Sequence, residues 1–246
     1  MKKNPQMKNN AFSPFGSEET YLWAESLFDS FLREPHGSAY GWGPPQNYPA
    51  HTEILKQGSP SSAVYFIEKG SVKLTWMDKE GHEVIAGLRH RHWIVGAPAV
   101  LLERAYSFTV TTLTPSVLRC ISARDFLNLV ETNGEFSQHL IRLLSQTIFN
   151  HSKSLVTMGC ASAKERLKDL LCRFIPDKGD QQAQSHDLKI HLPLKNKELA
   201  QILAVTPEHL SRLLKELEHE NLIRREKDGL ILLNPGLLKS RHISDD

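Results

Sequence analysis

The sequence lacks the cysteine pairs that would indicate a metal ribbon. Its three cysteines, Cys120, Cys160 and Cys172, are widely separated, and no two of them form a CxxC pair. This spacing argues against a zinc ribbon and a typical iron–sulfur site, so we expect no iron–sulfur cluster. We expect the three thiols to be small buried side chains in a reducing compartment.

Long hydrophobic runs, a secretory leader and the short enzyme motifs are also missing. The longest apolar run, residues 93–102, is about half of what a membrane-spanning helix needs. No signal peptide, Walker P-loop, H-E-x-x-H, G-x-S-x-G or dinucleotide glycine fingerprint is apparent. The sequence therefore predicts a cytoplasmic protein that has no membrane partner and is not an enzyme.

An excess of positive charge is absent too. The formal net charge is +2, and residues 195–246 contain nine Lys or Arg and nine Asp or Glu. Affinity for nucleic acid would therefore depend on the local placement of cations such as Arg212, Lys215, Arg224, Arg225 and Lys227. A chain of 246 residues with 40% apolar residues is long enough for two compact domains.

The most informative segment present is residues 194–234, LKNKELAQILAVTPEHLSRLLKELEHENLIRREKDGLILLN. Two short helical patterns are joined by a tight turn, and a two-stranded hairpin is expected to follow. Thr206 suits the N-cap of the second helix, and Pro207 suits its first turn. One face of this helix carries leucines at helical spacing: Leu210, Leu213, Leu214 and Leu217.

The opposite face of the second helix carries polar and charged side chains. Glu208, Ser211, Arg212 and Lys215 are three to four residues apart and project together, away from the leucines. Such groups match the donors and acceptors of the DNA major groove. The pattern predicts a helix-turn-helix whose second helix reads bases, followed by a wing.

The segment TPEHLSRLLKELEHENLI resembles the recognition helix of the cyclic-AMP receptor protein and fumarate–nitrate reduction regulator (CRP/FNR) family. With YFIEKGSVKL upstream, the resemblance spans roughly residues 50–235. It implies a homodimer that binds a pseudo-palindromic site in double-stranded DNA and works with RNA polymerase. The E-x-x-S-R pattern matches the oxygen-responsive branch and suggests a TTGA-like half-site, although Pro207 departs from both well-known branches. The expected DNA contacts are Thr206, Pro207, Glu208, Ser211, Arg212, Lys215 and Arg224.

The N-terminal third begins with a polar segment, residues 1–17, which we expect to be disordered. Residues 18–34 carry an apolar stripe typical of a helix, which Pro35 would end. Residues 35–49 are rich in proline, glycine and aromatic residues, which excludes a regular element. This segment is either an ordered loop on the surface of the next domain or a lid over a ligand pocket.

Residues 51–122 show seven short segments of strand character: TEILKQG, AVYFIEKG, SVKLTWM, EVIAGLRH, HWIVGA, SFTVTTL and SVLRCI. Turn signals separate them, and residues 78–81 suit a hairpin connection. The pattern predicts an antiparallel jelly-roll. The resemblance identifies it with the cyclic-nucleotide-binding β-roll.

The nucleotide contacts of that roll are incomplete in VGAPAVLLERAYSFT. Gly96 is present, but Ala97 occupies the position at which nucleotide-binding members have Glu. Tyr106-Ser107 occupies the position of their Arg-Ser pair. The nearby Arg104 lies two residues before the position of their arginine. We therefore expect no binding of cyclic AMP in the usual way, and an unidentified small-molecule effector. The candidate effector pocket comprises Gly96, Ala97, Arg104, Tyr106, Ser107, His151 and Ser152.

Twelve histidines leave haem open as a cofactor, since some relatives sense gases through haem. His90 and His92 alternate as on a strand, which would place both on one face. The alternative is that each histidine is solvated or hydrogen-bonded. The haem hypothesis rests only on the number of histidines in the sequence.

A long helix is expected at about residues 135–157. Its apolar positions form a heptad seam of Leu140, Leu144, Ile148, His151 and Leu155. The resemblance implies that this helix forms the homodimer interface; the alternative is core packing in a monomer. His151 would either fix the register through a hydrogen bond or respond to pH or a ligand.

The predicted fold is α+β, with a β-roll, a long dimerisation helix and a winged helix-turn-helix. The expected divisions are a tail at 1–17, an effector-sensing domain at 18–132, the dimerisation helix at 133–158 and a DNA-binding domain at 159–246. The predicted function is a DNA-binding transcription regulator. The alternatives are a haem-based gas or redox sensor of the same family, or an effector-binding module that does not bind DNA.

Overall fold

The computed structural model describes residues 41–172, 174, 188–190, 192–226 and 229–233. The predicted tail at 1–17 and the predicted helix at 18–34 lie outside the described residues.

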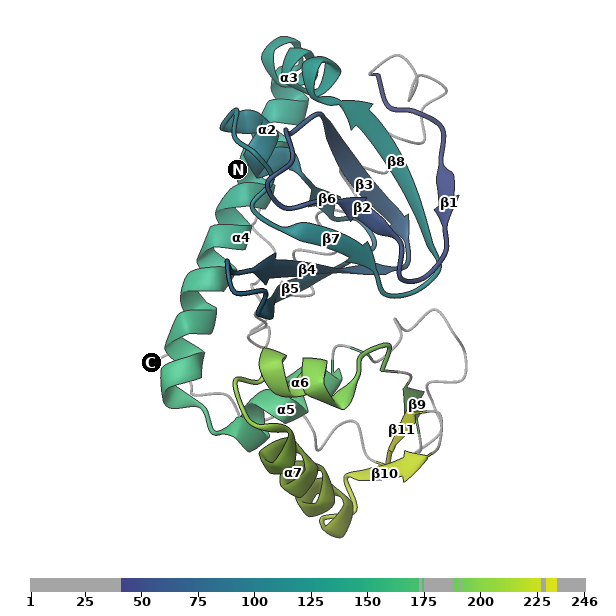
Figure 1. Ribbon diagram of the computed structural model, residues 1–246, viewed down its shortest axis with the longest axis vertical. Coiled ribbons are helices and arrows are strands. Elements are labelled where there is room, and N and C mark those ends of the chain that lie inside the picture. The colour runs from purple at the N-terminus through teal and green to yellow at the C-terminus, as the bar shows by residue number, and fades with distance from the viewer. Residues whose placement is uncertain (1–40, 173, 175–187, 191, 227–228, 234–246) are drawn as a thin grey trace, which may run out of the picture.

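The N-terminal domain is a roll of two four-stranded antiparallel sheets (Figure 1). Their orders are β1-β8-β3-β6 and β2-β7-β4-β5. Side chains from both sheets, among them Leu55, Ile67, Val72 and Leu118, form one buried cluster inside the roll. All seven predicted strands are present, and the predicted jelly-roll is confirmed. The strands are β1 (Gln46–Tyr48), β2 (Glu53–Leu55), β3 (Ala63–Lys69), β4 (Ser71–Met77), β5 (Glu83–His90), β6 (Ile94–Val95), β7 (Thr109–Thr112) and β8 (Ser116–Ser122).

The proline- and glycine-rich segment contains a strand that its composition led us to exclude. β1 pairs with β8 at the edge of its sheet, with Asn47 opposite Val117. An edge strand tolerates prolines at its ends because one side of its backbone needs no partner. Trp42 anchors the segment, since its ring is 3% exposed and meets Phe66 edge-on at 6.4 Å. This part of the segment is therefore packed onto the roll.

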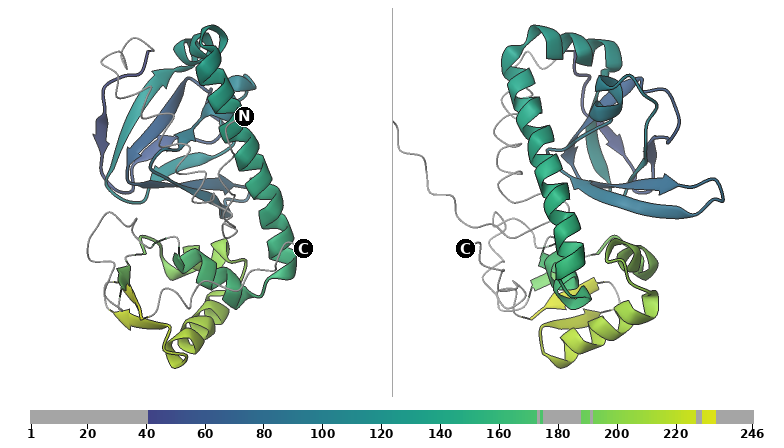
Figure 2. Two further views of the ribbon diagram at one scale, coloured as in Figure 1. Left: turned by 180° about the vertical axis from the view of Figure 1, so that it is seen from behind. Right: turned by 90° about the vertical axis from the view of Figure 1, so that its left-hand side faces the viewer.

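Among the described residues, three helices surround the roll or extend from it: α2 (Ala97–Leu101), α3 (Ala123–Thr132) and α4 (Gly134–Cys160). Ser122 caps α3, because its hydroxyl accepts a hydrogen bond from the Asp125 N–H at 3.1 Å. The first turns of α4 pack against α3, where Phe126 and Phe136 meet edge-on at 5.9 Å. From there α4 runs along one side of the roll down to the C-terminal domain (Figures 1 and 2).

The C-terminal domain combines three helices with a small antiparallel sheet of order β10-β11-β9. Its buried leucines, including Leu167, Leu171 and Leu217, form one apolar cluster. The predicted helix-turn-helix and wing are confirmed. No helix in the described part of the chain is both long and apolar enough to cross a membrane. The elements are α5 (Ala163–Cys172), β9 (Leu188–Ile190), α6 (Asn196–Ile202), α7 (Pro207–His219), β10 (Ile223–Glu226) and β11 (Gly229–Leu232).

Two glycines in left-handed turns of the roll provide a matched stability test. Gly70 has φ 89°, and a Cβ there would lie 2.2 Å from Ser116 Oγ and 2.8 Å from the Pro115 carbonyl oxygen. Gly81 has φ 88°, with nothing within 4 Å of such a Cβ. We expect Gly70→Ala to cost about 2–4 kcal/mol of unfolding free energy and Gly81→Ala only about 1 kcal/mol, the backbone strain that both share.

Chemical denaturation followed by tryptophan fluorescence measures this difference, because all four tryptophans precede residue 94. Equal losses in the two variants would show that the contact with Ser116 does not constrain the turn.

Candidate nucleic-acid interface and sensor pocket

The recognition helix α7 begins at a well-formed cap. The Thr206 hydroxyl accepts a hydrogen bond from the His209 N–H at 3.2 Å, and Pro207 occupies the first turn. The turn before it includes Ala204 in a left-handed conformation, φ 51°. Its amides remain satisfied, because the Ala204 and Val205 N–H groups donate to the Gln201 and Ala200 carbonyls. The cap and the turn together fix the direction in which α7 leaves α6.

The two faces of α7 are separated as the sequence predicts. All four predicted leucines are buried. The predicted DNA contacts are all exposed, and α7 lies on the side of its domain away from the roll (Figure 1). These exposed residues are Thr206, Pro207, Glu208, Ser211, Arg212 and Lys215 on or beside α7, and Arg224 on the wing.

Glu208 is held in its charged form at the start of α7. Hydrogen bonds from its own backbone N–H and from the Thr206 hydroxyl hold the pKa of the Glu208 carboxyl below its usual value. An ionised carboxylate at this position accepts hydrogen bonds and donates none. It therefore suits the amino group of a base rather than a carbonyl.

The wing is fastened to the recognition helix by an ion pair. Arg225 Nε donates to Glu218 Oε2 at 2.8 Å, and the Arg225 N–H donates to Glu218 Oε1 at 3.2 Å. Arg225, which the sequence suggested as a phosphate contact, is therefore engaged within the domain. Its neighbour Arg224 is exposed on β10.

In the sensor roll, Tyr106 fills the place where the resemblance predicts a phosphate contact. The ring is 5% exposed. Its hydroxyl donates to the Ala63 carbonyl at 2.6 Å and accepts from the Ala63 N–H at 2.9 Å. Gly96, φ 93°, lies against this ring, since a Cβ at Gly96 would be 3.4 Å from Tyr106 Cε1. The hydroxyl is thus fully used in holding α2 and its loop to β3.

The other predicted pocket residues do not supply the missing polar groups. Ala97 is buried at the start of α2 and carries no acceptor. Arg104 and Ser107 are exposed beside it. His151 and Ser152 belong to α4 instead, and both are exposed in the single chain.

Arg89 is a buried cation that the sequence reasoning missed. It is 7% exposed, its guanidinium lies 4.5 Å from the centre of the Trp93 ring, and its Nη1 donates to the Leu88 carbonyl at 2.8 Å. Gly87 makes room for it, because a Cβ there would be 2.9 Å from Arg89 Nη1. Although the His151 side chain is exposed overall, partial desolvation of its ring, and then the Arg89 charge, lower the pKa of His151 on α4.

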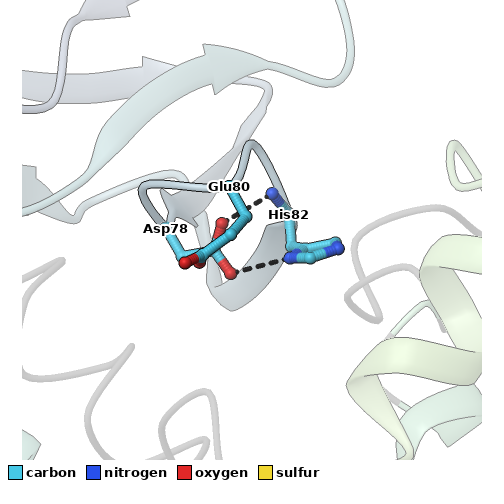
Figure 3. Close-up of side chains that lie close together, drawn as sticks. All are labelled: Asp78, Glu80 and His82. Atoms are coloured by element: carbon cyan, nitrogen blue, oxygen red, sulfur yellow. Dashed lines mark hydrogen bonds and ion pairs between the residues drawn. The ribbon is translucent and has the colours of Figure 1, made fainter.

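A small acidic cluster lies in the β4–β5 turn, where Asp78, Glu80 and His82 bring their ligand atoms within 4.8 Å of one another (Figure 3). Asp78 Oδ1 accepts from the His82 N–H at 2.8 Å, and Asp78 Oδ2 lies 2.9 Å from His82 Nδ1. These bonds are those of a tight hairpin turn, and the side chains of Glu80 and His82 are exposed. The cluster stabilises the turn, and we assign no metal to it.

The expectation that His90 and His92 share one strand face is wrong. β5 ends at His90, and His92 sits in the following turn with φ 67°. His90 meets Phe174 edge-on, whereas His92 stacks on Phe66. The expectation of buried cysteines also fails for Cys160, which is exposed, while Cys120 and Cys172 are partly buried.

The long helix carries an exposed apolar stripe that differs in one position from the predicted seam. Leu140 is 3% exposed and belongs to the core between α3, α4 and the roll. Ile141, Ile148 and Leu155 instead recur every seven residues and are 63%, 67% and 73% exposed. Leu144 is partly buried at the border of the core. Adjacent apolar residues at 140 and 141 made the two seams indistinguishable from spacing alone.

Comparison with known sequences matches the two domains separately. Residues 45–133 match the family described as cyclic nucleotide-binding domain, and residues 165–241 match the Crp-like helix-turn-helix domain. The chain belongs to the CRP/FNR family of transcription regulators. Members of this family are DNA-binding regulators and not enzymes.

The relatives of this CRP/FNR regulator are distant but match over most of their length. The cAMP-activated global transcriptional regulator CRP of Haemophilus influenzae is 24% identical over 217 residues, which cover 88% of this chain and 92% of the relative. The global nitrogen regulator of a Nostoc species is 25% identical over 203 residues, covering 80% and 89%.

Solved structures of similar fold include the c-di-GMP responsive regulator CLP of Xanthomonas campestris and FixK2 of Bradyrhizobium japonicum. CLP has a TM-score of 0.64 at 19% identity, covering 84% of this chain and 98% of CLP. FixK2 has a TM-score of 0.65 at 16% identity, covering 79% and 94%. They show that the two-domain fold is shared.

The double hydrogen bond of Tyr106 generates a stability prediction. We expect Tyr106→Phe to lose about 1–3 kcal/mol of unfolding free energy, because both backbone groups of Ala63 lose their partner. Tyr48→Phe is the matched control. Its hydroxyl donates only to the exposed Gln46 side chain, so its loss should stay within about 0.5 kcal/mol. Urea unfolding of both variants measures the difference, and a Tyr106→Phe protein as stable as the control would contradict the structural role of the hydroxyl.

Proposed function

We propose that this protein is a homodimeric transcription regulator that binds a pseudo-palindromic operator under the control of a small-molecule effector other than cyclic AMP. The proposal rests mainly on the two separate faces of α7. Four buried leucines fix its inner face, and the predicted base readers occupy its outer face. Membership of a DNA-binding family supports the same reading.

The exposed side chains of α7 differ in the DNA groups that they can bind. Arg212 offers a bidentate donor pair that suits the O6 and N7 atoms of guanine. Glu208 accepts from the amino group of cytosine or adenine, and Ser211 serves either role. The E-x-x-S-R pattern of Glu208, Ser211 and Arg212 resembles that of the oxygen-responsive branch, and from this resemblance we propose a TTGA-like half-site, with Pro207 as the departure from that branch. Lys215 and Arg224 lie where they would chiefly contact phosphate and fix the register.

The dimer is proposed to form along α4. Ile141, Ile148 and Leu155 lie one heptad apart, with Leu144 and His151 at the intervening positions. Two parallel copies of this helix would bury a stripe that is unusual on a single soluble chain. The pair of recognition helices would then meet half-sites about 34 Å, or one helical turn, apart. We expect the dimer to act in the cytoplasm with RNA polymerase.

The effector is proposed to differ from cyclic AMP because the expected contacts have been replaced. Ala97 supplies no ribose acceptor, and the Tyr106 hydroxyl is already committed to Ala63. The similar proteins include a cAMP-activated regulator and a c-di-GMP responsive regulator, so family membership alone does not identify the effector. The haem hypothesis gains no support, since His90 and His92 pack against separate aromatic rings. Tight, saturable binding of cyclic AMP with a matching rise in DNA affinity would contradict the proposal.

Arg212→Ala tests base reading. We expect a loss of about 1–3 kcal/mol on the specific operator, with relaxed discrimination at one base pair of each half-site. Lys215→Ala is the contrast variant, because loss of a phosphate contact should weaken all sequences about equally and reduce the salt dependence. Binding is measured by fluorescence anisotropy on the operator and on single-base variants of it. If Arg212→Ala weakens every sequence to the same extent, Arg212 does not read a base.

Ile148→Glu tests the proposed dimer seam. Placing two facing carboxylates in an apolar interface, and losing two buried isoleucines, should weaken dimerisation about 100-fold or more. Sedimentation equilibrium gives the dissociation constant directly. Glu131→Lys, an exposed charge change on α3, should leave it unaltered. A dimer that survives Ile148→Glu unchanged would place the interface elsewhere.

A further inference from the structure

The sensor roll and the DNA-binding domain share one apolar core. Ile85 and Leu88 of β5, together with Leu113 after β7, belong to the same buried cluster as the leucines of α5, α6 and α7. They are 8%, 1% and 4% exposed. His90, at the end of β5, meets Phe174 edge-on at 6.3 Å. The contact between the domains is therefore built from side chains that would otherwise be exposed to water.

Charged groups lock this contact at its edge. Lys73 of β4 reaches α6, where its Nζ donates to Glu198 Oε1 at 2.6 Å. Both side chains are largely buried, at 17% and 20% exposure. Lys73 also lies 3.6 Å from Glu83, and Gln201 Nε2 of α6 donates to the Glu83 backbone carbonyl at 3.1 Å. An ion pair shielded in this way is worth more than one on an open surface.

Glu198 acts on both sides of the contact. Its second oxygen, Oε2, accepts from the Lys195 N–H at 2.8 Å and so closes the first turn of α6. Burial raises the pKa of Glu198, but the hydrogen bonds from Lys73 and from the Lys195 N–H lower it by more, so the carboxylate is ionised at neutral pH. One carboxylate thus caps the helix and attaches it to the roll.

The position of α6 decides where α7 points. α6 lies on the side of its domain that faces the roll, and α7 lies on the far side (Figures 1 and 2). Arg166 of α5 ties the end of α6 to the interdomain connection. Its Nη2 donates to the Leu203 carbonyl at 3.0 Å, and its Nη1 donates to the Ala161 carbonyl at 2.7 Å. With α6 attached to β4 and β5, the recognition helix has a fixed orientation relative to the roll.

We propose that Lys73 and Glu198 are positioning residues for DNA recognition: their ion pair holds α6 against the β4–β5 hairpin and thereby sets the orientation of the recognition helix. The inference rests on the proposed function. In a dimer, the orientation of each α7 relative to its own roll fixes the distance between the two recognition helices. Neither residue touches DNA in this scheme, and both act through α6. In the arrangement with α6 held against the roll, the predicted base-reading residues of α7 are exposed, and the proposal takes this arrangement as the DNA-competent one.

The test is a double-mutant cycle in the full-length protein with Lys73→Met and Glu198→Gln. Met keeps the apolar stem of Lys73, and Gln keeps an oxygen that caps α6 while removing the charge. Lys79→Met, an exposed lysine at the tip of the same hairpin, is the matched control. Because the two residues form one contact, the double variant should lose little more than either single variant.

Hydrogen exchange gives a readout that needs no DNA. We expect the amides of α6, residues 196–202, to exchange about threefold to tenfold faster in each single variant and unchanged in Lys79→Met. If exchange at α6 is as slow in Lys73→Met as in the unaltered protein, the proposal fails, whatever the protein does with DNA.

The second readout is affinity for operators whose half-site spacing is changed one base pair at a time. The unaltered protein should prefer one spacing, and Lys73→Met should flatten that preference about threefold to tenfold while binding an isolated half-site as before. Equal loss at every spacing, or tighter binding by Lys73→Met, would overturn the positioning role. Failure of the unaltered protein to bind any operator would refute the proposed function instead, and the exchange result would still decide the contact.

Discussion

Burial of the leucine face of α7 is the constraint on which the DNA-binding surface depends. Each of these leucines is 6% exposed or less, and truncating one such side chain to alanine typically costs about 2–5 kcal/mol. An exposed ion pair on the outer face contributes about 0–1 kcal/mol. The leucines therefore decide the rotation of the helix about its axis, and the polar residues follow. Base-reading side chains can then vary without disturbing the fold, which suits a family whose members read different sites.

In the roll, by contrast, a residue that maintains the fold occupies a position expected to contact a ligand. Where the resemblance predicts a carboxylate and a cation for a nucleotide, the turn at Gly96 and the short helix α2 carry Ala97 and Tyr106, and the Tyr106 hydroxyl bonds the Ala63 backbone. A buried Arg89 lies instead at the edge of the roll, with its charge acting on His151 of α4. The roll thus matches the cyclic nucleotide-binding domain family, and we propose that its interior holds a different ligand. The contact of β4 and β5 with α6 connects the roll to the DNA-binding domain.

Sequence patterns predicted the elements that repeat a simple period over several residues. Alternation located the seven strands of the roll, and the cap at Thr206 located the start of α7. Strand β1 was missed because it is three residues long and flanked by prolines and glycines, and its pairing with β8 is visible only in three dimensions. Leu140 was assigned to the seam on α4 in place of Ile141, since both are apolar and only packing shows that Leu140 is buried in the core. The Lys73–Glu198 pair spans 125 residues and lies in no motif, so no local rule could find it.

We propose that two recognition helices, set apart by a dimer of α4, read one operator. Selection of binding sites from random double-stranded DNA by the full-length protein tests this most directly. We expect enrichment of a pseudo-palindrome with two TTGA-like half-sites about one helical turn apart. Enrichment of a single unpaired half-site would contradict the dimer, and recovery of no preferred sequence would contradict a base-reading role for α7.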